Sequence, residues 1–186
     1  IGLGIPAEPL FRSASKNGTV VSYYATDQVS VTESAEYVAN FQQMDGIIIG
    51  DAVASNSYLP MYYYYSLTEQ IYTASEMGGQ ATEISSVSFF NTGTSNVNRK
   101  LNVYMVNTDK TSFGSTLDWI PVTDANLVFS GSVTMTNRSW VTIYFNTPFA
   151  YDGTSNVALI VDDNSNSYNS YTYCRTFNTE TNQAIH

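Results

Sequence analysis

The stretch WVTIYFNTPFAYDGTSNVALIVDD, residues 140–163, decides the fold class. Residues 140–146 have the period-two alternation of a β-strand that buries one face. Asp152 and Gly153 then form a strong turn signal. The apolar run NVALIVDD, residues 156–163, does not alternate, as expected for a strand that is covered on both sides. Two such strands joined by a turn predict a layered all-β fold.

Four other stretches repeat the alternation and extend this prediction. They are SSVSFF (85–90), RKLNVYMVN (99–107), VFSGSVTMT (128–136) and SYTYCRTF (170–177). Clusters of Asn, Asp, Gly, Ser and Thr separate them, as turns do. Several short strands joined by polar turns predict an antiparallel β-sandwich of the jelly-roll type.

A helix is expected at only one place, the segment TASEMGG at residues 73–79. Thr73 and Glu76 have the spacing of a capping box. Gly78 and Gly79 would end the helix after about one turn.

The N-terminal part of the chain differs from the rest. Residues 1–10 have the character of a linker, with Pro6 and Pro9 limiting regular structure. Residues 11–46 predict three short strands, which could belong to the main sandwich or to the end of a neighbouring domain. We expect them to pack on the main sandwich, formed by residues 47–186. The three strands are Thr19–Ala25, Gln28–Thr32 and Tyr37–Gln42. At the other end, the apolar pattern of NQAIH predicts a final strand that is incomplete.

Composition excludes several classes of partner. Of 186 residues, 43% are hydrophobic and 14% aromatic, which is ample for a core and argues against disorder. The chain has 7 Lys and Arg against 16 Asp and Glu, for a net charge of −9. Nucleic acid and anionic membrane surfaces both require clustered Lys and Arg, so neither is an expected partner. Asn, Ser and Thr supply the polar surface, which suits a secreted β-protein that meets neutral, hydroxyl-rich ligands.

Catalytic chemistry also has little support. Cys174 is the one cysteine, so an intramolecular disulfide is impossible, and we expect a buried, inert side chain. His186, the one histidine, stands at the end of the sequence. The adjacent Asp162 and Asp163 would point to opposite faces of a strand, so they cannot form the facing pair of a glycosidase. We therefore predict a protein that is not an enzyme.

Four longer stretches resemble a known family. They are IIIGDAVASNSYLPMYYYYSLTEQIYTASEMGG, ISSVSFFNTGTSNVNRKLNVYMVNTDKTSF, DWIPVTDANLVFSGSV and FAYDGTSNVALIVDDNSNSY. Together they resemble secreted Bacteroidetes β-sandwich modules of the cleaved-adhesin and carbohydrate-binding jelly-roll group. The resemblance implies an extracytoplasmic, non-catalytic module that binds or adheres and is attached to other domains of a larger secreted protein.

Oxygen-rich turns offer ligands for a structural calcium ion. Calcium takes six to eight oxygens from carboxylates, amides and backbone carbonyls. Asp51 and Asp162 are the best candidates for ligands. Alternatively, the Asp and Asn side chains of these turns bond only to the nearby backbone.

The tyrosine run MYYYYS, residues 61–66, could be a platform for sugar rings. On a strand, Tyr62 and Tyr64 would point one way and Tyr63 and Tyr65 the other, so only one pair could face solvent. We take Tyr62 and Tyr64 as candidate carbohydrate ligands, with a purely structural role as the alternative.

The segment NSNSYNSYTYCR, residues 164–175, is a second candidate surface. Tyr171, Tyr173 and Arg175 would share one strand face and place rings beside a hydrogen-bond donor. The alternative is an ordinary cross-strand aromatic ladder. The complete set of candidate carbohydrate-binding residues is Tyr62, Tyr64, Trp119, Tyr168, Asn169, Tyr171, Tyr173 and Arg175.

These observations predict a non-catalytic carbohydrate-binding module that targets an attached enzyme or cell surface to a polysaccharide, with plant cell-wall glycans favoured. An adhesin domain for host protein or glycoprotein and a spacer domain without a ligand are the alternatives. Trp140 is expected to cover the edge of the core instead of binding a ligand.

Overall fold

The structure, a computed structural model, describes residues 10–16, 19–21, 37–42, 46–50, 54–56, 59–61, 64–168 and 173–186. Side chains are described for residues 46–50, 59–61, 64–168 and 173–186. The chain divides into two compact units, Ile1–Ile48 and Ile49–His186. Five predictions fall outside the described residues. They are the strand Gln28–Thr32 and the candidate site residues Asp51, Tyr62, Asn169 and Tyr171.

The first unit contains a three-stranded antiparallel sheet of order β2-β1-β3. Its strands are β1 (Leu10–Lys16), β2 (Thr19–Val21) and β3 (Tyr37–Gln42). The sequence predicted β3 with the same bounds, and the first residues of the predicted strand Thr19–Ala25 form β2. It missed β1, part of which was assigned to the linker. Packing of these strands on the main sandwich stays a prediction.

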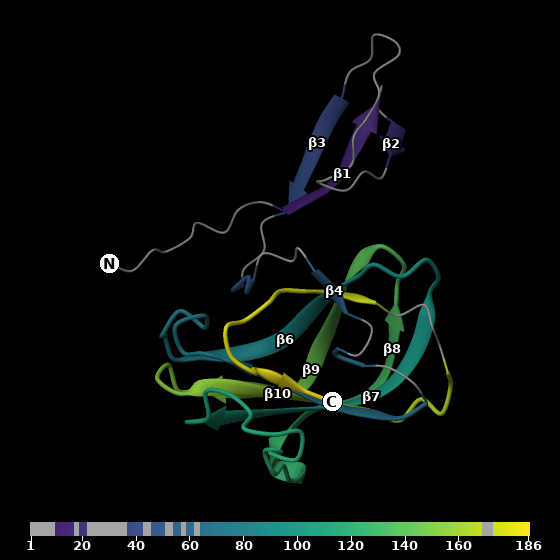
Figure 1. Cartoon of the computed structure of the whole chain (residues 1–186). Coiled ribbons are helices and arrows are strands. Elements are labelled where there is room, and N and C mark those ends of the chain that lie inside the picture. The colour runs from purple at the N-terminus through teal and green to yellow at the C-terminus, as the bar shows by residue number, and fades with distance from the viewer. Residues whose placement is uncertain are drawn as a thin grey trace. The chain divides into compact units, whose positions relative to one another are not determined.

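The second unit is built from two antiparallel sheets (Figure 1). The five-stranded sheet has the order β12-β5-β10-β7-β8, and the four-stranded sheet has the order β4-β11-β6-β9. The first sheet contains β5 (Ser66–Tyr72), β7 (Val97–Thr108), β8 (Leu127–Met135), β10 (Asn156–Asp163) and β12 (Ala184–Ile185). The second contains β4 (Ala54–Asn56), β6 (Thr82–Asn91), β9 (Ser139–Tyr151) and β11 (Cys174–Thr176). The predicted antiparallel β-sandwich is confirmed.

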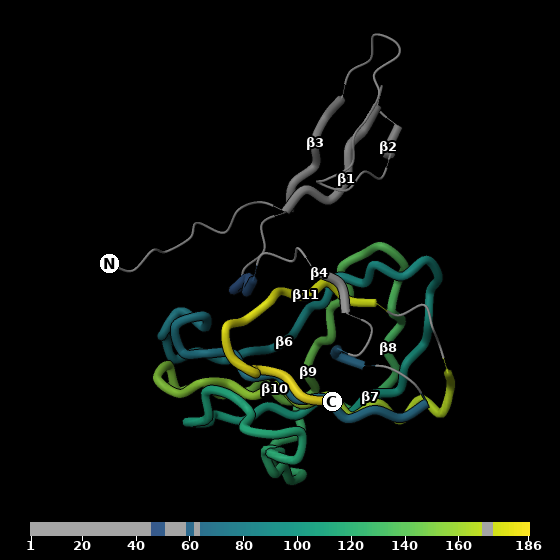
Figure 2. Tube along the Cα trace, viewed as in Figure 1, coloured from purple at the N-terminus to yellow at the C-terminus, as the bar shows by residue number. Residues whose placement is uncertain are grey.

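The path of the chain alternates between the two sheets (Figure 2). From β4 to β12, only β7 and β8 are consecutive strands that also lie next to each other in one sheet. A short 3-10 helix, η1 (Asp124–Asn126), precedes β8.

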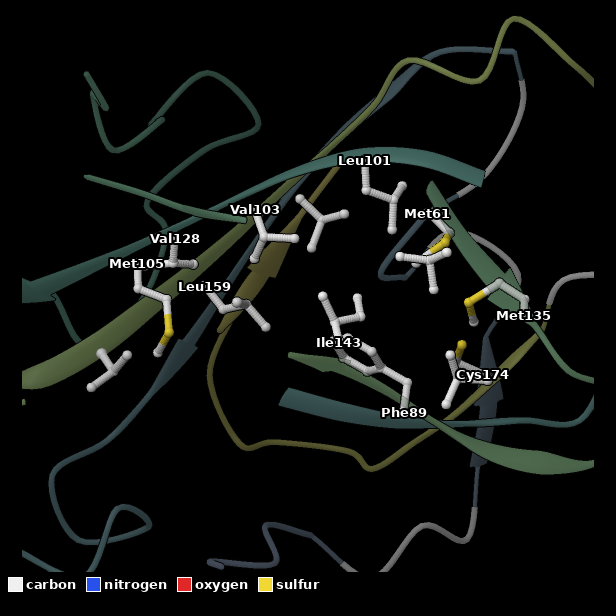
Figure 3. Packing of buried hydrophobic residues seen from close by; sticks show 14 of the residues in the cluster. Met61, Phe89, Leu101, Val103, Met105, Val128, Met135, Ile143, Leu159 and Cys174 are labelled. Carbon is white, nitrogen blue, oxygen red and sulfur yellow. The ribbon is translucent and has the colours of Figure 1, made fainter. Parts of the chain in front are cut away.

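The main core lies between the two sheets (Figure 3). Leu101 and Val103 of β7 point from one sheet, and Phe89 of β6 and Ile143 of β9 point from the other. Burial alternates along β7 and over the first residues of β9, as the sequence predicted. Cys174 is buried in the same cluster, and burial raises the pKa of its thiol to about 12, so the thiol stays protonated.

One ion pair is buried at the inner side of the five-stranded sheet. Arg99 of β7 donates through Nε to Oδ2 of Asp163 at 2.7 Å, and both side chains are almost fully inaccessible. Asp162, the preceding residue, is only partly buried, so the two carboxylates point to opposite faces as predicted. A charge in this position is tolerated because it is paired and hydrogen-bonded.

A second apolar cluster covers part of the outer side of the five-stranded sheet. Ile71 of β5 and Ile160 of β10 contribute from the sheet, and Phe113 and Ile120 contribute from the connection between β7 and β8. This connection lies against the sheet on the side away from β6 and β9 (Figure 1). Strand β10 is therefore covered on both sides, as its continuous apolar run predicted.

The expected helix at residues 73–79 is a hydrogen-bonded turn. The capping box is present, because the backbone N–H of Thr73 donates to Oε2 of Glu76 at 2.7 Å. Gly78 and Gly79, with φ of 78° and 63°, end the turn. Within the part of the chain that the structure describes, no helix is long and apolar enough to cross a membrane.

Tyr64 and Tyr65, the part of the tyrosine run that the structure describes, do not form a strand. Tyr64 and Tyr65 lie in a bend before β5 begins at Ser66, and their side chains are 50% and 60% exposed. The predicted alternation of one buried and one exposed ring is therefore wrong for these two residues. Outside a strand, neighbouring side chains are not forced to opposite faces.

Candidate functional site

A row of side chains crosses the outer face of the four-stranded sheet. Phe90 of β6 is in register with Trp140 of β9, and their rings meet edge to face at 5.7 Å between centroids. On the other side of Phe90, the guanidinium of Arg175 of β11 lies over the ring at 4.4 Å from its centroid. All three side chains are partly accessible. They point outward because their neighbours Phe89, Val141 and Cys174 point into the core.

The next rungs of the same two strands carry hydroxyl groups. Ser88 and Thr142 are cross-strand partners, and their hydroxyl oxygens lie 2.8 Å apart. One rung further, Ser86 is paired with Tyr144, whose side chain is 73% exposed. Trp140 and Tyr144 are four residues apart on one strand face, a separation of about 13 Å. The face therefore offers two rings with hydroxyls between them.

A groove of about 480 Å³ borders this face, between β8 and β9. These are the strands at the outer edges of the two sheets. The groove is lined by residues with rings (Phe129, Trp140 and Tyr144), by residues with hydroxyls (Ser132, Thr134, Thr136 and Thr142), and by Val133, Val141 and Ile143, whose side chains are buried in the core. Its volume lies in the range of typical small-ligand sites, and its mixture of rings and hydroxyls suits a polar ligand with apolar faces.

Two of the tyrosines chosen from the sequence meet in a separate cluster. The rings of Tyr64 and Tyr168 are 5.9 Å apart between centroids and are tilted by 36°. The backbone N–H of Asn166 donates to the carbonyl of Tyr64 at 2.9 Å, which joins the two segments. We call Tyr64 and Tyr168 the loop tyrosines.

The loop that carries Tyr168 is anchored to the buried ion pair. Nη1 of Arg99 donates to the carbonyl of Ser167 at 3.0 Å. The backbone N–H of Ser165 donates to Oδ1 of Asp163 at 2.9 Å. The hydroxyl of Ser165 in turn accepts a hydrogen bond from the backbone N–H of Lys100 at 2.8 Å. The ion pair therefore helps to fix the position of the loop tyrosines.

The other candidate ligands are dispersed. Arg175 belongs to the row on the four-stranded sheet, and Tyr173, 37% exposed, precedes it and accepts a backbone hydrogen bond from Thr92 at 2.6 Å. Trp119 is half-buried and packs against the second apolar cluster, on the cover of the five-stranded sheet. The candidates thus lie on at least two different surfaces.

Asp162, the candidate calcium ligand that the structure describes, is engaged by amides. Its Oδ2 accepts hydrogen bonds from Nδ2 of Asn164 at 2.7 Å and from Nδ2 of Asn102 at 3.4 Å. The described residues contain no group of three or more His, Cys, Asp or Glu side chains that could hold a metal ion. A calcium ion at Asp51 and Asp162 stays a prediction.

Glu69 of β5 is a buried carboxyl group that lies outside the groove. It is 1% exposed beneath the connection between β7 and β8, and its Oε2 accepts from the backbone N–H of Ile120 at 2.8 Å. Loss of hydration raises the pKa of this carboxyl above its usual value, while the bond from Ile120 and the nearby Lys110 oppose the shift. Its position gives it a structural role.

Sequence reasoning missed the residues that line the groove. Trp140 was assigned to the edge of the core, and neither Tyr144 nor Phe90, which contacts Trp140 from outside the groove, was singled out. The alternation over residues 140–146 carried the signal, because it already placed Trp140, Thr142 and Tyr144 together on one side of a strand. What it lacked was the finding that this side is the accessible one.

Comparison with known proteins gives no relative for the chain: no family model, no curated protein and no solved structure matches it. The resemblance to secreted Bacteroidetes modules stays a prediction.

Proposed function

We propose that the second unit is a jelly-roll module that binds polysaccharide and does not catalyse a reaction on it. The strand orders β4-β11-β6-β9 and β5-β10-β7-β8 support this topology, since a chain wound as an eight-stranded jelly roll gives this alternation between sheets. The module belongs to a secreted or cell-surface protein and directs attached domains to a glycan, with plant cell-wall polysaccharides favoured.

The observation that carries the proposal is the groove with Trp140 and Tyr144 along one wall. The apolar faces of sugar rings stack on aromatic side chains, which retain little conformational freedom to lose on binding. The hydroxyls of Thr142, Ser132 and Thr134 line the same groove and can exchange hydrogen bonds with sugar hydroxyls. Rings with hydroxyls between them match a ligand that alternates apolar faces with polar rims.

The position of the groove is consistent with binding to a long polymer. It lies between edge strands at the surface, and Tyr144 projects from it with most of its surface accessible. Among the described carboxyl groups, the one whose pKa is raised, Glu69, is instead buried under the connection that covers the other sheet. This separation favours binding over hydrolysis, which requires such an acid beside the bound sugar.

Affinity gel electrophoresis against soluble polysaccharides tests the proposal. The panel contains xylan, mixed-linkage glucan, xyloglucan, mannan, pectin and mucin. We expect at least one polysaccharide to retard the protein. Tyr144→Ala should weaken that retardation, with a Kd about tenfold higher and an unchanged melting temperature. Loss of a stacked ring accounts for about 1 kcal/mol or somewhat more.

Tyr64→Ala is the matched control, because it removes another exposed tyrosine ring, one that belongs to the loop tyrosines. If Tyr64→Ala abolishes retardation and Tyr144→Ala does not, the binding surface is the loop predicted from the sequence. If no glycan retards the protein, an adhesin or spacer role replaces the proposal. Repeating each gel with calcium and with EDTA tests the calcium ion expected at Asp51 and Asp162.

A further inference from the structure

The walls of the groove differ in charge from the rest of the chain. The whole chain has a net charge of −9. Yet the segment 127–151, which comprises β8, β9 and the turn between them, contains no Asp or Glu. Its one charged residue is Arg138, which is exposed in that turn. The groove is thus a local exception in an acidic protein.

Arg175 adds a second positive charge beside the groove. Its guanidinium rests on Phe90, and Phe90 is in turn in edge contact with Trp140, which lines the groove. The strands of the four-stranded sheet contribute one carboxylate, Glu83, and its cross-strand partner is Ala150, near the far end of β9. Among the described residues of these strands, the end of the sheet around Trp140 therefore has positive charge and no carboxylate.

Arg175 also differs from Arg99 and Lys110, two cations with ion pairs in the described part of the chain. Arg99 is paired with Asp163, and Lys110 is paired with Asp118. Among the described side chains, Arg175 has no carboxylate partner, and its contact is with the face of the Phe90 ring. Stacking of this kind fixes the plane of the guanidinium while its N–H groups point outward from the edge of that plane.

A guanidinium held in this way is suited to a planar, two-oxygen acceptor. Carboxylates accept two parallel hydrogen bonds from Arg, and these charge-assisted bonds are stronger than bonds to neutral hydroxyls. We propose that the glycan bound in the groove carries carboxylates, as uronic acid residues do, and that Arg175 binds one of them while Trp140 stacks on a sugar ring. This inference rests on the proposed function and names the class of its ligand.

The test compares one polymer in two charge states. Polygalacturonate and the same polymer with its carboxyl groups methyl-esterified are titrated against the full chain by isothermal calorimetry, in EDTA so that no calcium bridges form between carboxylates. We expect the free acid to bind at least about tenfold more tightly than the ester, and its affinity to fall as salt is added. Alginate and glucuronoxylan, titrated in parallel, identify which uronic acid is preferred.

Variants of Arg175 locate the effect. We expect Arg175→Gln to weaken binding of the free acid by about tenfold or more and to leave binding of the ester nearly unchanged. Arg175→Lys keeps the charge but lacks the two-pronged geometry, so an intermediate loss is expected. Lys100→Gln is the control, since it removes the same charge from an exposed position on the other sheet. Melting temperatures of all variants check that each is folded.

The outcomes separate this inference from the proposed function. If the acid and the ester bind equally, or if Arg175→Gln matches Lys100→Gln, the carboxylate assignment is overturned. Binding of a neutral glycan that still depends on Tyr144 would then leave the proposed function intact. If neither polymer nor any neutral glycan binds, both are overturned together.

Discussion

At the scale of single residues, Glu69 links the pH of the solution to the stability of the fold. The pKa of its carboxyl is raised above 4.5, chiefly because burial removes water from the charged form. The folded state therefore binds this proton more tightly than the unfolded state does. Its stabilising contribution is complete below pH 4.5 and is lost as the pH rises through the higher pKa of the folded state.

Glu69→Gln should remove this pH dependence. The amide oxygen can still accept the bond from Ile120 N–H, but the side chain no longer loses hydration of a charge on folding. We expect the variant to match the parent protein near pH 4 and to melt at a higher temperature at pH 7. Thermal unfolding between pH 4 and pH 8 measures both curves. Glu83→Gln, an exposed carboxylate on β6, is the control, and equal pH profiles for parent and Glu69→Gln would contradict the assignment.

The buried pair of Arg99 and Asp163 gives a second expectation at this scale. Asp163→Asn leaves the guanidinium buried without a counter-charge, which typically costs about 3–5 kcal/mol. Urea denaturation measures the free energy of unfolding. Asp162→Asn is the neighbouring control, since this partly accessible side chain bonds only to the amides of Asn102 and Asn164, and we expect a change under about 1 kcal/mol. Equal losses in the two variants would show that the buried charge is not the cause.

At the scale of elements, the turns differ in how strictly they require glycine. Gly78 and Gly153 have nearly the same backbone conformation, with φ of 78° and 80°. A Cβ atom on Gly78 would meet open space, whereas one on Gly153 would collide with the backbone nitrogen of Ala81. The two positions therefore separate the cost of a positive φ from the cost of a steric collision.

Replacement of each glycine by alanine makes that comparison. We expect Gly78→Ala to lower the free energy of unfolding by about 1–2 kcal/mol, the usual cost of this backbone region for a residue with Cβ. Gly153→Ala should lose clearly more, because the turn between β9 and β10 must also move away from Ala81. Chemical denaturation of both variants gives the difference, and equal losses would mean that the backbone near Ala81 yields freely.

The elements also show what the sequence could and could not predict. Alternation identified which side chains of β7 and β9 enter the core, because a strand turns successive residues to opposite faces. It could not tell which outer face is accessible. That depends on Phe113 and Ile120, which fold back from a connection whose own sequence has no strand or helix period. Trp119, a candidate ligand, is half-buried on the cover of the five-stranded sheet, and Trp140, which was expected to cover the edge of the core, is half-buried beside the groove.

The tyrosine run shows a different limit. Four aromatic residues in sequence have high strand propensity, yet Tyr64 and Tyr65 lie in a bend. The beginning of β5 at Ser66 is set by its pairing with β10, in which Ser66 lies opposite Asp163. Pairing partners almost 100 residues apart in the sequence cannot be found from local propensity.

At the scale of the whole molecule, protection of backbone amides from hydrogen exchange should decrease from the middle of the five-stranded sheet to the strands that flank the groove. Strand β10 is paired on both edges and covered on both faces. Strands β8 and β9 each have one unpaired edge. We expect hydrogen exchange measured by mass spectrometry to be slowest for residues 157–161 and much faster for residues 139–144. Equal rates in the two segments would contradict this ranking.

The alternation along β9 has a consequence for how such a protein can change over time. Side chains at positions 140, 142 and 144 line the groove, and those at 141 and 143 fill the core, so the surface of the groove and the packing of the core are specified by different residues of one strand. A library that randomises only these three codons would vary the surface of the groove while every clone keeps the same hydrophobic interior. Substitutions at the three positions can therefore accumulate in duplicated copies without altering the buried core.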